Sequence, residues 1–531
     1  MGIKLGKSEF PRGSGPDDFQ CFGPPATEDG QFDKVKIADL GCFDQSGKDS
    51  NKYYHGAVVQ HKKTKKWYTY FEWGRTGATS PQFQFVECSS ESDAQQEFAD
   101  QLHDKNDKRG MWATIGGIKT LTAKPNKDCY LVRPMATRST GLPDAKTIKL
   151  NEGSKAAVPA PTKGAPAAVV KKVSIDKYTM KLMKDLMGGT LSYTRGAMAD
   201  SSLPTQKSIE EARQILQEAQ KRLIKVGDDV DKQAADNELV QLTRVMYSRI
   251  PKKKALHCAA EDWILNKNNI MMWNADLDAF ESALYVYDDT TVDDDNDPLQ
   301  GIPVKMEWVD PSSALGKFLY AWWPKASANR HYGVGDMKIK NMWRIARNGD
   351  DEKLINEVKK VKTDLKNKNI KERPLFQPSE RMDCQDRIKD YKESNTNLLL
   401  HGTRSVNVVG ILRESFRLPK ELVGVVITGS MFGPLLYMAD DWRKSAGYTS
   451  LHGSCWSGGS GSVRGREAFM FACDVVCGNP FVAPGPKGYT TAPVGYHCIF
   501  GKGGYSQVQN NEWVIPNKNQ VCIKYLCEFT T

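Results

Sequence analysis

Hydrophobic residues recur with different periods along the chain, and the first clear pattern lies between about residues 53 and 88. Short apolar runs alternate there with polar turns in "YYHGAVVQ", "WYTYFEWGR" and "QFQFVEC". Runs of this length and alternation indicate strands of a small antiparallel sheet. Next, Ala94, Phe98 and Leu102 share one face of a helix that begins after Ser90 as its N-cap. The pattern predicts a sheet with one helix.

A second pattern has the helical period of 3.6 residues. The segment "SIEEARQILQEAQKRLI" opens with a possible capping box, Ser208 and Glu211, and places its apolar residues on one stripe. A further helix, "NELVQLTRVMYSRI", stops before Pro251, and another is expected in "LDAFESALYVY". We interpret the stripes as core packing, which predicts an all-α region.

From about residue 301 the pattern is mixed, with apolar runs such as "LLLHGT" and, near the end, "EWVIPNKNQVCIKYLCEF" with strand character on both sides of a Pro-Asn turn. An Ala/Pro/Lys stretch, "NEGSKAAVPAPTKGAPAAVVKK", reads as a linker. We therefore predict a multidomain α+β protein. The expected segments are a disordered tail (1–33), the small sheet domain (34–140), a linker (141–172), a helical domain (173–297) and a mixed α+β domain (298–531).

Composition excludes several classes of protein and kinds of site. The chain has 531 residues, a formal net charge of +10 and no apolar run long enough for a membrane helix. The N-terminus lacks the apolar core of a secretory signal and fails the myristoylation pattern at Gly6. The 12 cysteines form no C-x-x-C and only eight histidines are present, so we expect reduced thiols, no metal and no membrane partner.

A cluster of cations accompanies "FEWGRTG" in the sheet domain. A hairpin with a core tryptophan and a solvated arginine would explain this motif without function. The surrounding cations favour phosphate contacts instead. The motif and its surroundings resemble a WGR domain, the DNA-break-sensing module of the DNA-dependent poly(ADP-ribose) polymerases. The resemblance and the basic turn give these candidate DNA-binding residues: Trp73, Gly74, Arg75, Lys62, Lys63, Lys65 and Lys66, with Lys105, Lys108 and Arg109 after the helix.

The run "LLLHGTRS" ends a strand pattern on His401, followed by Gly402. Taken alone, a histidine bonded to a nearby carbonyl is an ordinary strand end. However, "LLLHGTRSVNVVGIL", "GSMFGPLLYMADDWRKSAGY" and "NNEWVIPNKNQVCIKYL" together resemble the ADP-ribosyltransferase catalytic domain, and the helical segment resembles that family's regulatory domain. The order of DNA sensor, helical gate and transferase is that of the shorter, zinc-finger-less, DNA-dependent poly(ADP-ribose) polymerases.

The resemblance implies NAD+ as co-substrate and a set of site residues. His401 would bond the adenine-side ribose, the Gly402 backbone and Ser445 would hold the nicotinamide carboxamide, Tyr448 would stack on the nicotinamide and Tyr437 would lie opposite. The NAD-binding candidates are His401, Gly402, Thr403, Arg417, Tyr437, Ser445 and Tyr448, and the catalytic ones are Glu512, His401 and Tyr437.

Glu512 completes this set. Cleavage between nicotinamide and ribose passes through an oxocarbenium-like state, which a carboxylate stabilises, and the same carboxylate can activate an acceptor hydroxyl. In isolation, a glutamate at a strand start would be taken for a solvent-facing residue. Its place in the family motif implies competence for chain elongation.

The sequence departs from the family pattern where Pro434 and Leu435 replace a usual Lys-Gly pair and Ser430 a usual tyrosine. The leading hypothesis is a nuclear polymerase, activated by DNA strand breaks in the DNA damage response, that modifies acceptor proteins including itself. A DNA-end-binding scaffold with impaired transferase activity, or a mono-ADP-ribosyltransferase, are the alternatives.

Overall fold

A computed structural model describes most of the chain, and every structural statement below refers to the described residues. They are 3–15, 18–21, 36–44, 50–76, 82–106, 112–115, 117–121, 131–132, 135–138, 148–149, 175–199, 203–253, 260–267, 269–288, 298–299, 302–326, 337–366, 368–375, 381–418, 431–451, 461–463 and 467–530. The expected linker (141–172) lies outside them except for Ile148–Lys149, and Lys108, Arg109 and Ser430 also lie outside them.

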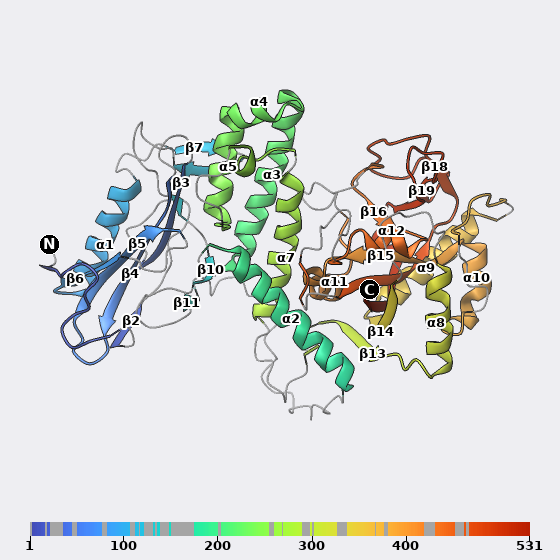
Figure 1. Ribbon diagram of the computed structural model, residues 1–531, viewed down its shortest axis with the longest axis horizontal. Helices are drawn as coiled ribbons and strands as arrows, with labels where there is room; N and C mark the ends of the chain where they lie inside the picture. The colour runs from blue at the N-terminus through green and yellow to red at the C-terminus, as the bar shows by residue number, and fades with distance from the viewer. Residues whose placement is uncertain are drawn as a thin grey trace. The chain divides into compact units, whose positions relative to one another are not determined.

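The chain forms two compact units. The first unit comprises Met1–Val169 and Thr194–Leu284, and the second comprises Val170–Tyr193 and Tyr285–Thr531. Helices and sheets occur in both (Figure 1), which confirms the predicted multidomain α+β class. The unit boundaries differ from the predicted domain limits, because the start of the predicted helical domain belongs to the second unit.

The first unit contains an antiparallel sheet with strand order β1-β6-β5-β4-β3-β9, and β2 pairs with β4. Helix α1 buries Ala94, Phe98 and Leu102 against the sheet, and the Asp93 amide donates to Ser90 Oγ, as the pattern predicts. The elements are β1 (Ile3–Lys4), β2 (Phe19–Cys21), β3 (Ile37–Asp44), β4 (Ser50–His61), β5 (Trp67–Arg75), β6 (Gln82–Cys88), α1 (Glu91–Asn106) and β9 (Leu131–Val132).

The expected disordered tail instead contributes β1 and β2 to this sheet. Phe19 is fully buried, and its ring lies 4.9 Å from the ring of Phe85. Phe10 packs 5.0 Å from Phe83. Aromatic burial therefore holds this segment on the sheet, which its Gly, Pro and charge content did not reveal.

The rest of the first unit is mainly helical, and α3, α5 and α7 lie side by side in Figure 1. The predicted capping box at Ser208 is wrong. Helix α3 begins earlier, because Thr205 is the N-cap and its hydroxyl accepts from the Ser208 amide at 3.0 Å. The elements are α3 (Gln206–Val226), α4 (Val230–Ala235), α5 (Asn237–Arg249), α6 (Ala260–Trp263), α7 (Ile270–Asp288) and the short strands β7 (Trp112–Ile115), β8 (Ile118–Leu121), β10 (Met135–Arg138), β11 (Ile148–Lys149) and β12 (Leu203–Pro204).

The second unit contains two sheets. One has the order β13-β14-β21-β17-β15 and the other β16-β20-β19-β18. The strands are β13 (Val304–Trp308), β14 (Lys338–Arg347), β15 (Thr396–Thr403), β16 (Leu436–Met438), β17 (Ala468–Val476), β18 (Pro480–Val482), β19 (Cys498–Gly501), β20 (Glu512–Ile515) and β21 (Val521–Thr530). The helical segments are α2 (Lys177–Ala197), α8 (Ala314–Lys325), α9 (Asp350–Asp364), η3 (Gln385–Arg387), α10 (Ile388–Glu393), η4 (Ser405–Asn407), α11 (Val408–Glu414), α12 (Trp442–Ala446) and η6 (Lys518–Gln520).

The main core of the second unit includes the first part of α2. Leu182, Met183, Leu186 and Met187 are buried in one cluster with residues of β14, β15, β17 and β21. This helix segment is therefore a structural part of the second unit, together with the predicted mixed α+β domain. Periodicity alone assigns it to the helical region, because an apolar stripe does not reveal what covers it.

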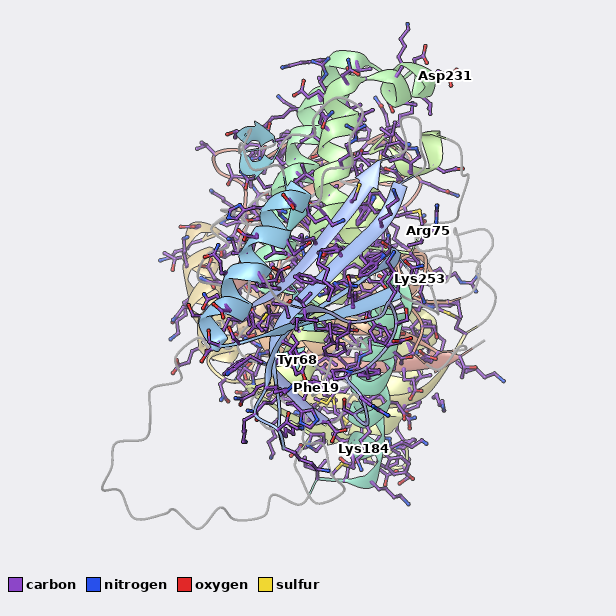
Figure 2. All side chains as sticks on the ribbon, turned by 90° about the vertical axis from the view of Figure 1, so that its left-hand side faces the viewer. Phe19, Tyr68, Arg75, Lys184, Asp231 and Lys253 are labelled. Carbon is purple, nitrogen blue, oxygen red and sulfur yellow. The ribbon has the colours of Figure 1, made fainter. Side chains whose placement is uncertain are left out.

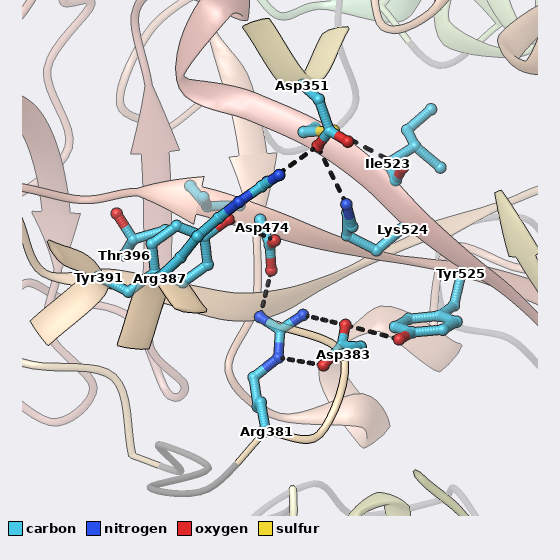
Figure 3. Close-up of polar contacts among 12 residues, drawn as sticks. Asp351, Arg381, Asp383, Arg387, Tyr391, Thr396, Asp474, Ile523, Lys524 and Tyr525 are labelled. Atoms are coloured by element: carbon cyan, nitrogen blue, oxygen red, sulfur yellow. Dashed lines mark hydrogen bonds and ion pairs between the residues drawn. The ribbon is translucent and has the colours of Figure 1, made fainter. Parts of the chain in front are cut away.

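A buried polar cluster fixes α10 and the segment just before η3 to the five-stranded sheet (Figure 3). Arg381 bonds both Asp474 on β17 and Asp383, and Asp383 accepts from Tyr525 Oη at 2.6 Å. The Asp474 carboxylate also accepts from Tyr391 Oη at 3.0 Å. Breaking such a buried network would leave charges unpaired, so α10 has a firm anchor on the sheet.

Candidate functional site

His401 and Gly402 lie where the two sheets of the second unit meet. β15 carries both residues at the edge of the five-stranded sheet, and a bridge between Leu400 and Ala439 joins this edge to the chain just after β16. His401 Nδ1 lies 2.9 Å from the Tyr437 carbonyl oxygen. A carbonyl only accepts, so Nδ1 carries the proton and Nε2 is an acceptor. Burial lowers the pKa of His401, which favours this neutral ring.

Gly402 is required by a close approach of α12. A Cβ at this position would lie 1.9 Å from the Ser445 carbonyl oxygen, so no side chain fits. Ser445 is buried, and its hydroxyl lies 3.3 Å from the Leu400 carbonyl. Thr403 is buried one residue further along β15, and Tyr448 is partly exposed just after α12. The structure thus brings β15 and α12 together.

Glu512 begins β20 and is almost fully buried, with 6% of its side chain exposed. Its Oε1 forms an ion pair with Lys444 Nζ on α12. Its Oε2 is buried and has no hydrogen-bond partner among the described residues. A buried acceptor without a donor is costly, so this oxygen is available to a ligand hydroxyl.

The strand of Glu512 is held in place by Asp440, which the sequence analysis did not single out. Asp440 is 4% exposed. Its Oδ2 accepts from Trp513 Nε1 at 3.0 Å, Asn511 Nδ2 at 3.1 Å and the Leu375 amide at 2.9 Å. Since Asn511 and Trp513 flank Glu512, Asp440 fixes the backbone on both sides of the carboxylate.

Tyr437 and Arg417 already have partners. The Tyr437 hydroxyl donates to the Gly433 carbonyl and accepts from the Phe432 amide, both at 2.9 Å. Arg417 bonds Tyr285 Oη and Glu414, both at 2.7 Å. Tyr437 therefore shapes the turn before β16 through its hydroxyl, and Arg417 would exchange partners to reach a ligand.

The departure from the family pattern at Leu435 is absorbed by the core. Leu435 is buried among Phe432, Ile499 and Val514 of the four-stranded sheet. An apolar residue here adds packing to the strand that pairs with β20.

The candidate DNA-binding residues of the first unit fall into two groups. Trp73, Gly74 and Arg75 end β5, whereas the basic turn Lys62–Lys66 precedes it. Eight residue steps separate Trp67 from Arg75, roughly 27 Å of strand. Figure 2 shows Tyr68 and Arg75 well apart on this sheet.

The two groups also differ in their contacts. Trp73 is partly buried, stacks on Tyr54 and donates to Gln82 Oε1 at 3.0 Å, while Lys105 Nζ lies 4.6 Å from the Tyr54 ring centre. In the turn, Lys66 pairs with Glu87 at 2.6 Å. The structure therefore unites Trp73 and Lys105 at one end and places the basic turn at the other.

Comparison with known proteins gives one family match within each unit. Residues 337–531 match the poly(ADP-ribose) polymerase catalytic domain, and residues 42–114 match the WGR domain. The chain carries the catalytic domain of the poly(ADP-ribose) polymerases and a WGR domain. His401, Ser445 and Glu512 all lie within the catalytic domain, and Trp73 and Arg75 lie within the WGR domain.

Relatives support this assignment. The chain is 22% identical over 480 residues to poly [ADP-ribose] polymerase 1 of Gallus gallus, covering 88% of this chain and 40% of that protein. It is 22% identical over 533 residues to the Danio rerio protein of the same name, covering 93% and 45%. A shorter match, 31% over 150 residues, covers 26% of this chain and 7% of protein mono-ADP-ribosyltransferase PARP4 of Mus musculus. The chain thus spans less than half the length of the first two relatives.

Two residues of the site were missed at the level of sequence. Lys444 directly precedes Ser445 and Asp440 lies in the quoted "LLYMADDW", so both were within the motif but carried no local signal. No cluster of three metal-ligating side chains occurs among the described residues, and no helix among them is long and apolar enough to cross a bilayer.

Proposed function

We propose that this chain is a poly(ADP-ribose) polymerase activated by DNA strand breaks. It cleaves NAD+, releases nicotinamide and transfers ADP-ribose to acceptor proteins, to itself and to growing chains. The family match and the relatives support NAD+-dependent ADP-ribosyl transfer. The WGR domain supports DNA as the activating partner, and a role in the DNA damage response implies a nuclear protein.

The Glu512 carboxylate is the observation that carries this proposal. Lys444 occupies one oxygen and fixes the side chain, while the other oxygen is buried without a partner among the described residues. His401 Nε2 is a second acceptor, set by the Nδ1 bond to Tyr437. Two acceptors call for a ligand with hydroxyl donors, which the riboses of NAD+ provide.

These residues divide the reaction between them. His401 and the backbone of Gly402 bind and orient NAD+. Glu512 stabilises the positive charge that develops on the ribose as the bond to nicotinamide breaks. The same carboxylate then takes the proton of the attacking hydroxyl when a chain is extended.

One assay separates the alternatives. Purified full-length chain is incubated with NAD+, with and without a nicked oligonucleotide, and nicotinamide release and product size are measured. We expect DNA-stimulated release of nicotinamide and long polymer. Binding of the oligonucleotide without nicotinamide release would support the DNA-end-binding scaffold. Single ADP-ribose units on protein would support a mono-ADP-ribosyltransferase, the alternative with which the match to PARP4 agrees.

We also propose a form of regulation: the helical segment between the WGR domain and the catalytic domain restrains the transferase activity until DNA binds. The structure sharpens its test, because Leu182, Met183, Leu186 and Met187 belong to the catalytic core and must stay. Replacing residues 194–284 by a Gly/Ser linker should give activity that no longer needs DNA. A folded variant of this kind that still requires DNA would contradict the restraint.

A further inference from the structure

A strongly basic stretch of the catalytic unit lies in residues 359–373, "KKVKTDLKNKNIKER", which contain seven cations and two carboxylates. We call this stretch the basic segment. It covers the end of α9 and the chain that follows it. The other end of α9 is held by the ion pair between Asp351 and Lys524 on β21 at 3.1 Å (Figure 3). Five of its lysines are exposed and have no ion-pair partner among the described residues: Lys359, Lys360, Lys366, Lys368 and Lys371.

Two contacts fix the course of the basic segment. Near its start, Asp364 Oδ2 lies 3.5 Å from His497 Nε2, immediately before β19. Near its end, Glu372 pairs with Lys502 at 2.7 Å, immediately after β19. The described parts of the segment on either side of residue 367 therefore contact the residues at opposite ends of β19.

The lysines of the basic segment also act electrostatically on His497, the residue just before β19. Burial lowers the pKa of His497, Asp364 opposes this shift, and Lys368 and Lys360 add to it. These two lysines are therefore close enough to His497 to influence its proton. The basic segment is thus a positive surface over this strand, not a remote run of charge.

β19 leads directly to the catalytic carboxylate. Its last residue, Gly501, is the register partner of Glu512 on β20. The loop between these strands is held by a bond from the Gly503 amide to Asn511 Oδ1 at 3.0 Å. It presents Tyr505 with 61% of its surface exposed, three residues after Lys502.

We propose that the basic segment, with Lys502 and Tyr505, binds the growing poly(ADP-ribose) chain and keeps it at the active site. The inference rests on the proposed function, because that activity makes the polymer. Poly(ADP-ribose) carries two phosphates and one unpaired adenine per unit. Cations along a track with an exposed aromatic ring are what single-stranded chains of phosphates and bases bind.

Duplex DNA is the competing occupant, and the observations disfavour it. The bases of a duplex are stacked inside, so an exposed tyrosine gains little from them. The track also begins one residue beyond the partner of Glu512, which is where a growing chain would emerge. A retained polymer would favour repeated addition to one chain over new starts.

The first test measures binding without NAD+, by fluorescence anisotropy of labelled, size-fractionated poly(ADP-ribose) and of a labelled duplex oligonucleotide. The variant combines Lys366→Gln, Lys368→Gln and Lys371→Gln in the full chain. The matched control combines Lys317→Gln, Lys325→Gln and Lys338→Gln, which are exposed lysines of the same unit on or beside α8 and β14.

We expect the first variant to bind polymer at least tenfold more weakly at low salt and the control to bind as the wild type does. The slope of log affinity against log salt should fall by about 2, since each lost phosphate contact removes about 0.7. Tyr505→Ala should weaken polymer binding without changing that slope. Equal effects of the two triple variants, or loss of duplex binding alone, would overturn the proposal.

The second test measures product length during DNA-stimulated turnover. The Lys366/Lys368/Lys371 variant should release nicotinamide at an initial rate near that of the wild type but make shorter chains. Chains of wild-type length would refute the retained polymer. If the wild type itself makes no polymer, the proposed function fails, whereas the binding of supplied polymer is judged independently.

Discussion

The proposed catalytic site and the proposed DNA-binding surface of the WGR domain differ in the burial of their charged side chains. Glu512 is buried, paired on one oxygen with Lys444 and left open on the other. In the WGR domain, the cations of Lys62–Lys66 are exposed and stand on the order of 27 Å from Arg75. Cleavage of one bond in a substrate depends on one carboxylate at a fixed position, whereas a phosphate backbone can be bound through many weak contacts with separate cations. Single substitutions should therefore have large effects in the first region and small, additive ones in the second.

The largest effect should come from Glu512→Gln. The change keeps the shape but removes the charge, so it should cost about 3 kcal/mol of transition-state stabilisation, or about a hundredfold in kcat. Elongation should suffer more than initiation, leaving short or single ADP-ribose units with NAD+ affinity little changed. Gel analysis of the products and steady-state kinetics measure this.

A matched control is Glu307→Gln, because Glu307 is an exposed, ion-paired glutamate on β13. It should behave as the wild type. Long polymer made at the wild-type rate by the Glu512→Gln protein would remove this residue from its proposed role.

Asp440→Asn should have the next largest effect. The amide offers a neutral oxygen to donors that now bond a carboxylate, and bonds to charged groups are the stronger ones. We expect kcat to fall about tenfold with KM nearly unchanged, since Asp440 positions Glu512 without lying in its ion pair. Asp440→Ala should lose more, because it leaves three donors buried without an acceptor. Equal losses for both variants, or a change confined to KM, would contradict a positioning role.

Smaller effects are expected at the WGR surface. Arg75→Ala, or Trp73→Ala, should reduce DNA-stimulated activity several-fold and leave basal turnover nearly intact, because these residues lie outside the catalytic domain. Neutralising Lys62, Lys63 and Lys65 tests the other end of β5. If both ends contact DNA, their effects should add, as expected for sites this far apart, and each should lower the salt dependence of binding. Salt-independent binding would exclude a phosphate-reading surface.

The smallest effect concerns pH. Burial lowers the pKa of His401 below its ordinary value of about 6.5, so the ring is neutral at pH 7 and above. Less than a twofold change in kcat/KM is expected from this group between pH 8 and 7. In a plot of kcat/KM against pH, the fall on the acid side should lie below about pH 6.5, where His401 Nε2 gains a proton and can no longer accept a hydrogen bond.

The same group links stability to acid. Below about pH 6.5 His401 binds a proton in the unfolded chain but stays neutral in the folded one. Its contribution to the free energy of unfolding therefore falls as pH decreases towards the lowered pKa of the folded state. A His401 acid limb above pH 7 would contradict the neutral, buried ring.

The sequence predicted more of the local structure than of the pairings between distant segments. The helix with Phe98 on its buried face and the strands on both sides of the Pro-Asn turn are confirmed, because periodicity reports local structure. The strand that contains His401 is also confirmed, but it ends two residues later than predicted, at Thr403. The Lys444 to Glu512 ion pair joins residues far apart in sequence, and no local pattern encodes it. The need for glycine at 402 likewise arises from the Ser445 carbonyl, which only the folded chain brings near.

Helix α2 has a further consequence for where such a chain can be divided. The catalytic core is discontinuous in sequence, since Val170–Tyr193 and Tyr285–Thr531 flank a second body that contains residues 194–284. Residues 194–284 in turn belong to the same unit as Met1–Val169, so each unit is interrupted by a segment of the other. A natural or engineered fragment that starts at residue 298 would lack Leu182, Met183, Leu186 and Met187, and would expose the apolar surface that they cover. Such a fragment should aggregate, whereas one that retains residues 175–193 should remain monodisperse.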